Sequence, residues 1–266
     1  MKLVFDIGAT NTRLSFVKNG RLLKPVEFRT PATFKQGLKK FSAYVGKQKL
    51  SGIAGCLPGH MDPKGKKWGR LRNLPGWSFV DFDLQFRKHF HCPAYVRNDV
   101  EMASLGEAVR GAGVGKNVVA YLTVSTGING ARVVDGKLDR AAWGWSIGRQ
   151  IISETKDLES QVSGAGLLRR FGRPAEQIRN AQVWREVYKK LALGLFNTVL
   201  FWSPDVLVLG GGMVGAGAVK LSKLAGELRI LKKKMRSNVP LPPMVRSKLG
   251  QLAGLYGAME YLKLSR

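Results

Sequence analysis

The chain has 266 residues, of which 44% are hydrophobic, so it can bury a sizeable core in one or two domains and is not intrinsically disordered. No apolar run approaches the roughly 20 residues that cross a bilayer and no secretory signal is recognisable, so we expect a cytoplasmic protein without membrane partners. The two cysteines, Cys56 and Cys92, exclude a disulfide framework and are more typical of small buried residues than of metal ligands.

The net charge is strongly positive. Lysine and arginine number 44 against 18 aspartates and glutamates, which gives a net charge of +26 and a pI of about 10.5. A field of this size attracts nucleic acid, acidic lipid or polyphosphate without specificity at low salt. The basic residues are spread along the chain rather than gathered in a tail, which indicates a basic surface. Natural divergence and deliberate charge engineering both remain open as its origin.

The first part of the chain predicts a β-rich start with a crossover helix. Strand patterns cover residues 3–5, 13–17, 22–28, 52–57 and 94–96. Between the third and fourth of these strands, residues 33–46 show apolar side chains at helical spacing. A second helix is expected over residues 99–110, with Asn98 and Asp99 at its N-terminus.

The second part repeats the order of strand and glycine-rich turn. Residues 118–124 predict a buried strand, residues 125–131 a turn, and residues 132–134 a further strand. A long helix pattern at residues 183–203 ends before Pro204, which cannot continue it. The strand pattern of residues 205–209 then leads into three glycines, and the tail, residues 250–262, is again helical.

A glycine turn follows the first strand in the segment Asp6-Ile7-Gly8-Ala9-Thr10-Asn11-Thr12-Arg13, and it indicates a phosphate-binding loop. Gly8 permits a tight turn, and the hydroxyl and amide groups of Thr10, Asn11 and Thr12 can donate to anionic oxygens. Asp6 stands where a metal ion could sit. The start of an ordinary hairpin is the alternative, because Asn, Thr and Gly fill many turns.

Other motif interpretations fail on specific residues. The pattern G-x-G-x-x-G at residues 210–215 lacks the acidic residue of a dinucleotide site, since Lys234, Met235 and Arg236 stand about twenty positions later. Residues 111–117 resemble a P-loop, but Asn117 replaces the metal-binding hydroxyl. A serine hydrolase triad is excluded because no histidine follows Ser125. The group of two histidines and a cysteine at residues 89–92 lacks a distant pair of ligands for a metal.

Taken together, the motifs resemble those of the ROK family (repressor, open reading frame, kinase), within the hexokinase, actin and heat-shock ATPase superfamily, and glucokinase-like members are the most similar. The resemblance covers essentially the whole chain, through residues 6–13, 98–100, 125–149, 158–164, 210–212 and 255–258. It implies an α/β, two-lobed actin-like ATPase (ribonuclease H-like) fold with an interdomain cleft. The N-terminal lobe would comprise residues 1–115 and 250–266, and the C-terminal lobe residues 116–249.

The resemblance also implies roles for individual residues. Asp99 would be the general base, although its residue type and position alone favour a helix cap. Asp6 would orient Mg²⁺ or its water. Phosphate binding falls to Gly8, Thr10, Asn11, Thr126 and Gly127. The adenosine pocket would be lined by Gly210, Gly211 and Gly212. The sugar would be approached by Gly59, Asn73, Asn98 and Glu159.

Two positions depart from the family pattern. Where it has a glutamate and a histidine that hold sugar hydroxyls, this sequence has Ser146 and Arg149. Loss of a carboxylate acceptor removes a charge-assisted hydrogen bond of about 1.5–3 kcal/mol, and Ser146 is too short to replace it. For Arg149 three interpretations remain open: it lowers the pKa of Asp99, it receives an anionic substrate group, or it points to solvent. Residues 150–166 lack the cysteines of the zinc motif that many relatives carry, so no structural zinc is expected.

The sequence therefore predicts a glucokinase-like enzyme that uses ATP and Mg²⁺ to phosphorylate a hexose or amino-hexose through an altered sugar subsite. One alternative is a catalytically impaired or engineered protein of this fold that retains nucleotide binding. Another is a protein that binds polyanions through its basic surface. A homodimer is also left open.

Overall fold

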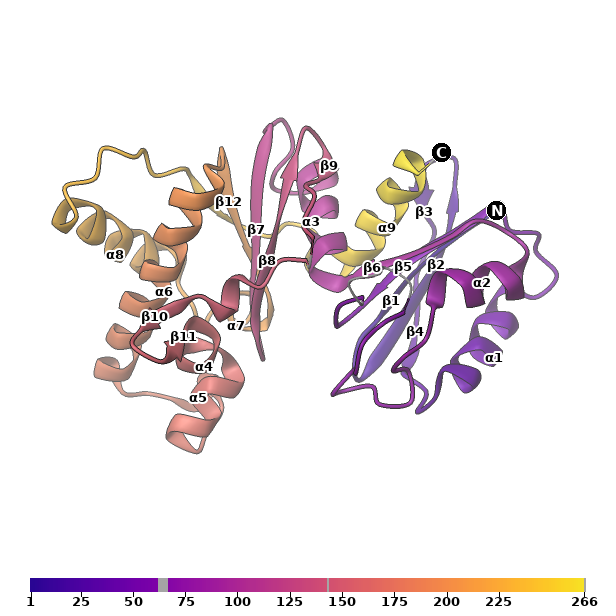
Figure 1. Ribbon diagram of the computed structural model, residues 1–266, viewed down its shortest axis with the longest axis horizontal. Helices are drawn as coiled ribbons and strands as arrows, with labels where there is room; N and C mark the ends of the chain where they lie inside the picture. The colour runs from indigo at the N-terminus through magenta and orange to yellow at the C-terminus, as the bar shows by residue number, and fades with distance from the viewer. Residues whose placement is uncertain (62–66, 143, 266) are drawn as a thin grey trace. The chain divides into compact units, whose positions relative to one another are not determined.

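The computed structural model describes residues 1–61, 67–142 and 144–265, and these fall into two compact units (Figure 1). The first unit comprises Met1–Val109, Arg140–Gly144 and Gln251–Arg266, and the second comprises Arg110–Asp139 and Trp145–Gly250. The lobe boundaries expected after residues 115 and 249 stay a prediction.

A six-stranded sheet forms the centre of the first unit. Its strands are β1 (Lys2–Ile7), β2 (Asn11–Lys18), β3 (Arg21–Leu22), β4 (Val26–Arg29), β5 (Gly52–Leu57) and β6 (Ala94–Asn98). The order is β3-β2-β1-β5-β6, with β4 paired to β2. Because β1, β5 and β6 run parallel, their carboxyl ends meet at one edge, which brings Asp6 and Asn98 to the same side of the sheet.

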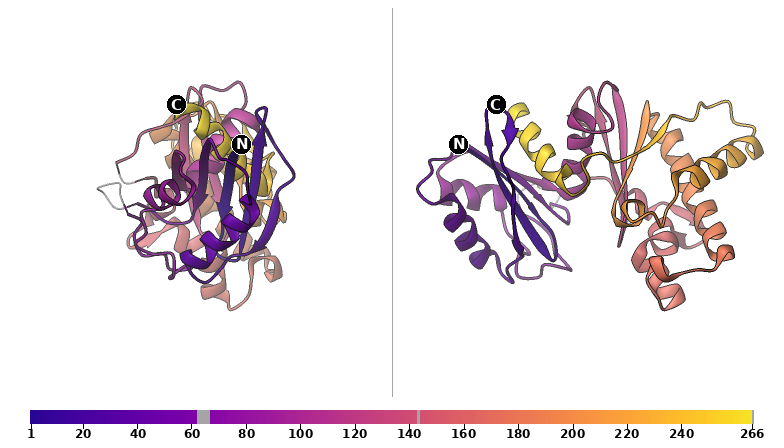
Figure 2. Two further views of the ribbon diagram at one scale, coloured as in Figure 1. Left: turned by 90° about the vertical axis from the view of Figure 1, so that its right-hand side faces the viewer. Right: turned by 180° about the vertical axis from the view of Figure 1, so that it is seen from behind.

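Helices cover both faces of this sheet (Figure 2). On one face, α1 (Phe34–Val45) and α2 (Phe82–Phe90) pack against the side chains of Leu3 and Phe5. On the other, α3 (Asp99–Arg110) and α9 (Ala253–Leu264) pack against Val4. This alternation follows from the two-residue period of a strand, and it also turns Asp6 towards the face covered by α9.

The second unit has a five-stranded sheet in the order β13-β12-β7-β8-β9. Its strands are β7 (Val118–Val124), β8 (Ile128–Val134), β9 (Lys137–Leu138), β12 (Val206–Gly210) and β13 (Met244–Arg246). The strands β7, β12 and β13 run parallel, whereas β8 and β9 continue the sheet as an antiparallel hairpin. This mixture matches the expected repeat of strand, turn and strand.

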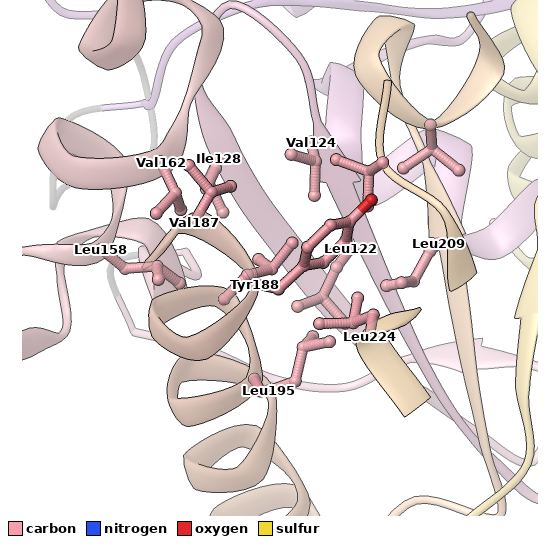
Figure 3. Close-up of a cluster of buried hydrophobic side chains, with 14 of the residues drawn as sticks. Leu122, Val124, Ile128, Leu158, Val162, Val187, Tyr188, Leu195, Leu209 and Leu224 are labelled. Carbon is pink, nitrogen blue, oxygen red and sulfur yellow. The ribbon is translucent and has the colours of Figure 1, made fainter. Parts of the chain in front are cut away.

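One apolar core joins this sheet to its helices (Figure 3). Leu122 and Val124 of β7 and Leu209 of β12 contribute from the sheet. The helices of the core are α4 (Leu158–Val162), α5 (Gly164–Phe171), α6 (Ala181–Trp202) and α8 (Leu221–Lys234). The remaining short elements are η1 (Ile147–Arg149), β10 (Ile151–Ser153), β11 (Lys156–Asp157), η2 (Ala175–Gln177), α7 (Gly212–Gly215) and η3 (Gly250–Leu252).

Three expected elements are corrected by the structure. The strand expected at residues 22–28 is two strands, β3 and β4, separated by residues 23–25. The strand β8 begins at Ile128, so the turn after β7 is shorter than expected. The strand β2 begins at Asn11, so Asn11 pairs with β4 at the edge of the turn, and Thr12 pairs with both β1 and β4. None of the helices in the described ranges has the length and apolar character of a bilayer-spanning segment.

Candidate functional site

Asp6 lies near the end of β1, between its neighbour on β5 and the start of α9. Cys56, its register partner, donates its thiol to Oδ1 of Asp6 over 3.4 Å. Gly254 in the first turn of α9 leaves room for the carboxylate, because a Cβ there would stand 3.1 Å from Oδ2. Burial, together with the charge of Asp99, raises the pKa of Asp6 from 3.8 to about 6. Burial disfavours the ionised form of Asp6, and a cation bound beside the carboxylate would stabilise that form.

The surroundings of Asp6 suit Mg²⁺, and they do not suit a metal ion whose ligands are all protein side chains. Mg²⁺ prefers oxygen ligands and usually keeps waters and substrate phosphates beside one or two carboxylates. Among the described residues, no group of three His, Cys, Asp or Glu side chains is arranged to hold a metal ion. A single carboxylate acting directly or through water is what Asp6 offers.

Asn98 caps α3 and leaves Asp99 at the head of the helix. Oδ1 of Asn98 accepts from the backbone N–H groups of Val100, over 2.9 Å, and Glu101, over 3.2 Å. Oδ1 of Asp99 also accepts from Val100 N–H, over 3.0 Å. The capping role that its residue type favours for Asp99 is therefore largely filled by Asn98.

The electrostatic surroundings of Asp99 suit a proton acceptor. Burial raises the pKa of its carboxyl above the usual value, while backbone hydrogen bonds and the charge of His60 oppose that rise. A buried carboxylate with a raised pKa accepts a proton more readily than an exposed one. The structure thus places the expected base on the first unit, in electrostatic reach of Asp6.

The loop after β5 is fixed against this base. Gly59 has φ of +111°, in the region that favours glycine, and a Cβ there would stand 2.4 Å from Cδ2 of Leu71. Its carbonyl oxygen accepts from Nδ2 of Asn98 over 2.8 Å. Further along, Leu71 and Leu74 are buried and hold a turn on which Asn73 is exposed. The amide of Asn73 is therefore available to a ligand, and its expected role in sugar binding stays a prediction.

The first turn contains one clear correction. Thr12 is completely buried on β2, and its hydroxyl shares a hydrogen bond of 2.9 Å with that of Thr30, so it cannot serve a phosphate. Nδ2 of Asn11 donates to Glu27 over 2.9 Å. Gly8 donates its N–H to the carbonyl of Asn11 over 2.9 Å, which closes the turn. Of the expected phosphate-binding side chains in this turn, Thr10 is the one that is exposed.

In the second unit, the turn between β7 and β8 is tied to α5. The N–H groups of Gly164 and Ala165 donate to the carbonyls of Ser125, over 2.8 Å, and Thr126, over 3.0 Å. Thr126 is exposed, so its hydroxyl can reach a ligand. Gly127 has no space for a side chain, because a Cβ would stand 2.7 Å from Oε2 of Glu159.

Glu159 is engaged through both of its oxygens. Oε2 accepts from the N–H of Ile128 over 2.9 Å, and Oε1 lies 3.5 Å from Nη2 of Arg149. Nη1 of Arg149 forms a second ion pair, with Asp157, over 2.9 Å. Ser146 is exposed just before η1. The expected effect of Arg149 on the pKa of Asp99 stays a prediction.

The three glycines at the end of β12 and directly after it differ in what they can contribute to a ligand site. Gly210 is buried, and a Cβ on it would stand 2.4 Å from the hydroxyl oxygen of Tyr121. Gly211 has φ of +89° and packs against Thr123, whereas Gly212 is exposed at the start of α7. A ligand can therefore approach the backbone of Gly212 and, partly, that of Gly211, while Gly210 serves packing.

A cavity of about 610 Å³ lies in the second unit beyond α7. Its wall combines the aromatic rings of Trp184 and Tyr188 with the small residues Gly217 and Ala218. Basic side chains from α6 and α8, among them Arg185 and Lys223, stand at the same cavity. This volume and the flat apolar wall suit a nucleoside, whereas Glu176 and Glu227, which also line the cavity, do not favour attached phosphates. The sequence did not identify these residues, since they come from four separate segments.

Comparisons with known proteins agree with the motifs. The model of the ROK family matches residues 3–264. Fructokinase from Zymomonas mobilis is 29% identical over 239 residues, which cover 78% of each chain. The structure of a ROK hexokinase from Thermus thermophilus matches with a TM-score of 0.84 and 25% identity, over 99% of this chain and 98% of the other.

A further solved structure carries ligands. The ROK family glucokinase from Streptomyces griseus, in complex with glucose and AMPPNP, matches with a TM-score of 0.74 and 21% identity over 98% of both chains. These matches confirm the expected α/β, two-lobed actin-like ATPase fold.

Proposed function

Because this chain belongs to the ROK family and is an ATP-dependent sugar kinase, we propose that it transfers the γ-phosphoryl group of ATP to a hydroxyl of a hexose or amino-hexose. The observation that carries this proposal is the Asp99 carboxylate, half-buried at the head of α3 beside the capping side chain of Asn98, with its pKa raised by desolvation. The names of the relatives include a fructokinase, a hexokinase and a glucokinase, so the choice of sugar stays open.

In the proposed reaction, Asp99 accepts the proton of the attacking hydroxyl. As the bond from the sugar oxygen to the γ-phosphorus forms, the bond from that phosphorus to the bridging oxygen breaks and ADP leaves. The hydroxyl proton passes to the Asp99 carboxylate, whose raised pKa makes it a stronger base. Asn98 fixes the position of that carboxylate by capping the helix, and holds the Gly59 loop through its other side-chain atom.

The expected roles in nucleotide binding are as follows. Asp6 would bind Mg²⁺, directly or through a water, and when bound the ion neutralises phosphate charge. The exposed hydroxyls of Thr10 and Thr126 are the expected phosphate donors, with Gly8, Asn11 and Gly127 shaping their turns. We assign the adenosine to the cavity near Trp184 and Tyr188, reached over the backbone of Gly211 and Gly212.

The sugar subsite of the second unit is the altered part of the enzyme. The family glutamate and histidine are replaced by Ser146 and Arg149, and Arg149 pairs with Asp157 and Glu159. A sugar hydroxyl that donates to Glu159, the remaining expected acceptor, would therefore compete with the guanidinium of Arg149. We propose that this change weakens sugar binding.

A panel of sugars tests the proposed function. ADP release is followed in a coupled assay with MgATP and glucose, mannose, fructose, N-acetylglucosamine or N-acetylmannosamine. We expect at least one sugar to give sugar-dependent ADP formation. If no sugar is phosphorylated while ATP still binds, the chain is the catalytically impaired alternative. The proposal also includes a cytoplasmic location, and a homodimer stays open.

A further inference from the structure

The first unit contains an imidazole and a carboxylate that none of the proposed roles uses. They belong to His60, on the loop after β5, and to Glu101, in the first turn of α3. We propose that His60 and Glu101 bind neighbouring hydroxyls of the sugar, in place of the pair lost at residues 146 and 149, and so determine which sugar is accepted. This inference rests on the proposed function.

The two side chains converge on Gly144, a residue distant from both in sequence. An ideal Cβ on Gly144 would stand 3.1 Å from Nδ1 of His60 and 3.6 Å from Oε1 of Glu101. Gly144 has φ of +75°, which favours glycine, so no side chain fills this point. An imidazole and a carboxylate therefore both lie close to the backbone of Gly144, at the end of the segment Arg140–Gly144 that belongs to the first unit.

Backbone hydrogen bonds hold both residues beside the base. The carbonyl of His60 accepts from Gly69 N–H over 3.0 Å, and the preceding carbonyl, of Gly59, accepts from Asn98. The N–H of Glu101 donates to the same Asn98 side chain over 3.2 Å. Asn98 therefore positions the loop of His60, the turn of Glu101 and the carboxylate of Asp99 together.

The charges of the three side chains act on one another. The charge of His60 lowers the pKa of Asp99, and the charge of Asp99 raises that of Glu101. Arg97 acts on Glu101 in the opposite direction and favours its ionised form. A sugar whose reacting hydroxyl faces Asp99 would thus present its next hydroxyls to His60 and Glu101.

The chemistry of the pair suits adjacent hydroxyls. A carboxylate accepts strongly from a hydroxyl, and a ring nitrogen of histidine accepts or donates according to its tautomer. In the described ranges, the imidazole of His60 makes no hydrogen bond that would compete with a ligand. The carboxylate of Glu101 accepts from the backbone N–H of Asn98 and keeps further lone pairs for a sugar hydroxyl. Glu159 in the second unit differs, because both of its oxygens already have partners.

Three variants test this inference with the best sugar from the panel. His60→Ala removes the imidazole, and Glu101→Gln keeps the shape but removes the charge. His89→Ala is the matched control, because its imidazole lies in the same unit and bonds Ser42 on α1. The Michaelis constants for sugar and for ATP are measured separately, together with the affinity for sugar by tryptophan fluorescence.

We expect His60→Ala to raise the KM for sugar about 3- to 10-fold and Glu101→Gln about 10- to 100-fold, from the loss of a neutral and a charged hydrogen bond. The KM for ATP should stay within about twofold in both, as should every constant of His89→Ala. With a deoxy-sugar that lacks the contacted hydroxyl, Glu101→Gln should behave like the wild type, because the interaction is already absent.

The outcomes separate the inference from the function on which it rests. An active wild type whose KM for sugar is unchanged by both substitutions overturns the inference alone. A wild type that phosphorylates and binds no sugar overturns the proposed function and this inference with it. His60 is exposed, so His60→Ala is decisive even if Glu101→Gln lowers the yield of folded protein.

Discussion

The side-chain amide of Asn98 donates to the carbonyl oxygen of Gly59 over 2.8 Å, and this bond ties the loop after β5 to the head of α3. The same side chain accepts from two N–H groups of the helix. Asn98, at the end of β6, therefore fixes the position of the proposed base, Asp99, relative to the proposed sugar-binding loop at Gly59. Its substitution should affect both stability and sugar binding.

Two substitutions of Asn98 separate its role as the cap of α3 from its hydrogen bond to Gly59. Asn98→Ala loses the cap and the bond to Gly59, so the free energy of unfolding should fall by about 1–3 kcal/mol. Asn98→Asp keeps a good capping oxygen but cannot donate to Gly59, so it should lose less stability and still bind sugar more weakly. Urea unfolding and the KM for sugar measure the two effects. An Asn98→Ala variant as stable as the wild type would show that this cap contributes little.

The raised pKa of Asp6 predicts a pH-dependent stability. Because the folded pKa of about 6 exceeds the unfolded value of 3.8, the folded chain holds this proton more tightly. Its contribution is fully present below about pH 3.8 and is lost as the pH rises through about 6, a change of about 2–3 kcal/mol. Asp6→Asn carries no such charge, so its stability relative to the wild type should increase by that amount between pH 4 and pH 7.

Urea unfolding of both proteins in buffer with EDTA measures this difference, since other titrating groups are common to the two. A difference that does not change between pH 4 and pH 7 would contradict the raised pKa. Addition of MgATP should reduce the advantage of Asp6→Asn at pH 7, because a cation at the site favours the carboxylate.

Restoring the family residues should strengthen sugar binding. The double variant Ser146→Glu with Arg149→His adds a carboxylate acceptor and frees Glu159 from the guanidinium, so the KM for sugar should fall about 10- to 100-fold. Arg149→Ala is the control that frees Glu159 without adding a ligand. Its effect on stability should be small, because the Arg149 side chain is 62% exposed and its ion pairs are screened by water. An unchanged KM in the double variant would place the sugar away from these residues.

The charge of +26 predicts salt-sensitive binding to polyanions. Affinity for duplex DNA of unrelated sequences should be similar and should fall steeply as the salt concentration rises, because counterions are released on binding. A plot of log affinity against log salt concentration measures this slope. Binding that is absent, or insensitive to salt, would remove the basic surface as an interaction site.

Much of the fold could be predicted because its signals are local. The buried strand before Asp6, the helix after Asn98 and the long helix ending before Pro204 all follow from periodicity, capping and proline. Thr12 was misjudged for a non-local reason. It looks like a turn residue, but pairing of β2 with β4 places its hydroxyl against Thr30.

The sequence predicts only those residues of the candidate site that belong to a recognisable motif. Asp99 and the glycine turns belong to ordered motifs, whereas the partners of Arg149 depend on how η1 packs beside α4. His60 gives no periodic signal, and its meeting with Glu101 and Gly144 arises from folding of distant segments. The cavity near Trp184 has the same origin, since its wall combines helices and loops that no single pattern links.

The most direct test of the kinase mechanism is the turnover number of Asp99→Asn with MgATP and the preferred sugar. Asn keeps the size of the side chain but cannot accept the hydroxyl proton, so kcat should fall about 10²- to 10⁴-fold with little change in the KM for ATP. Asp81→Asn, which retains a capping residue at the start of α2, should remain fully active. An Asp99→Asn enzyme as fast as the wild type on that sugar would contradict the assignment of Asp99 as the base.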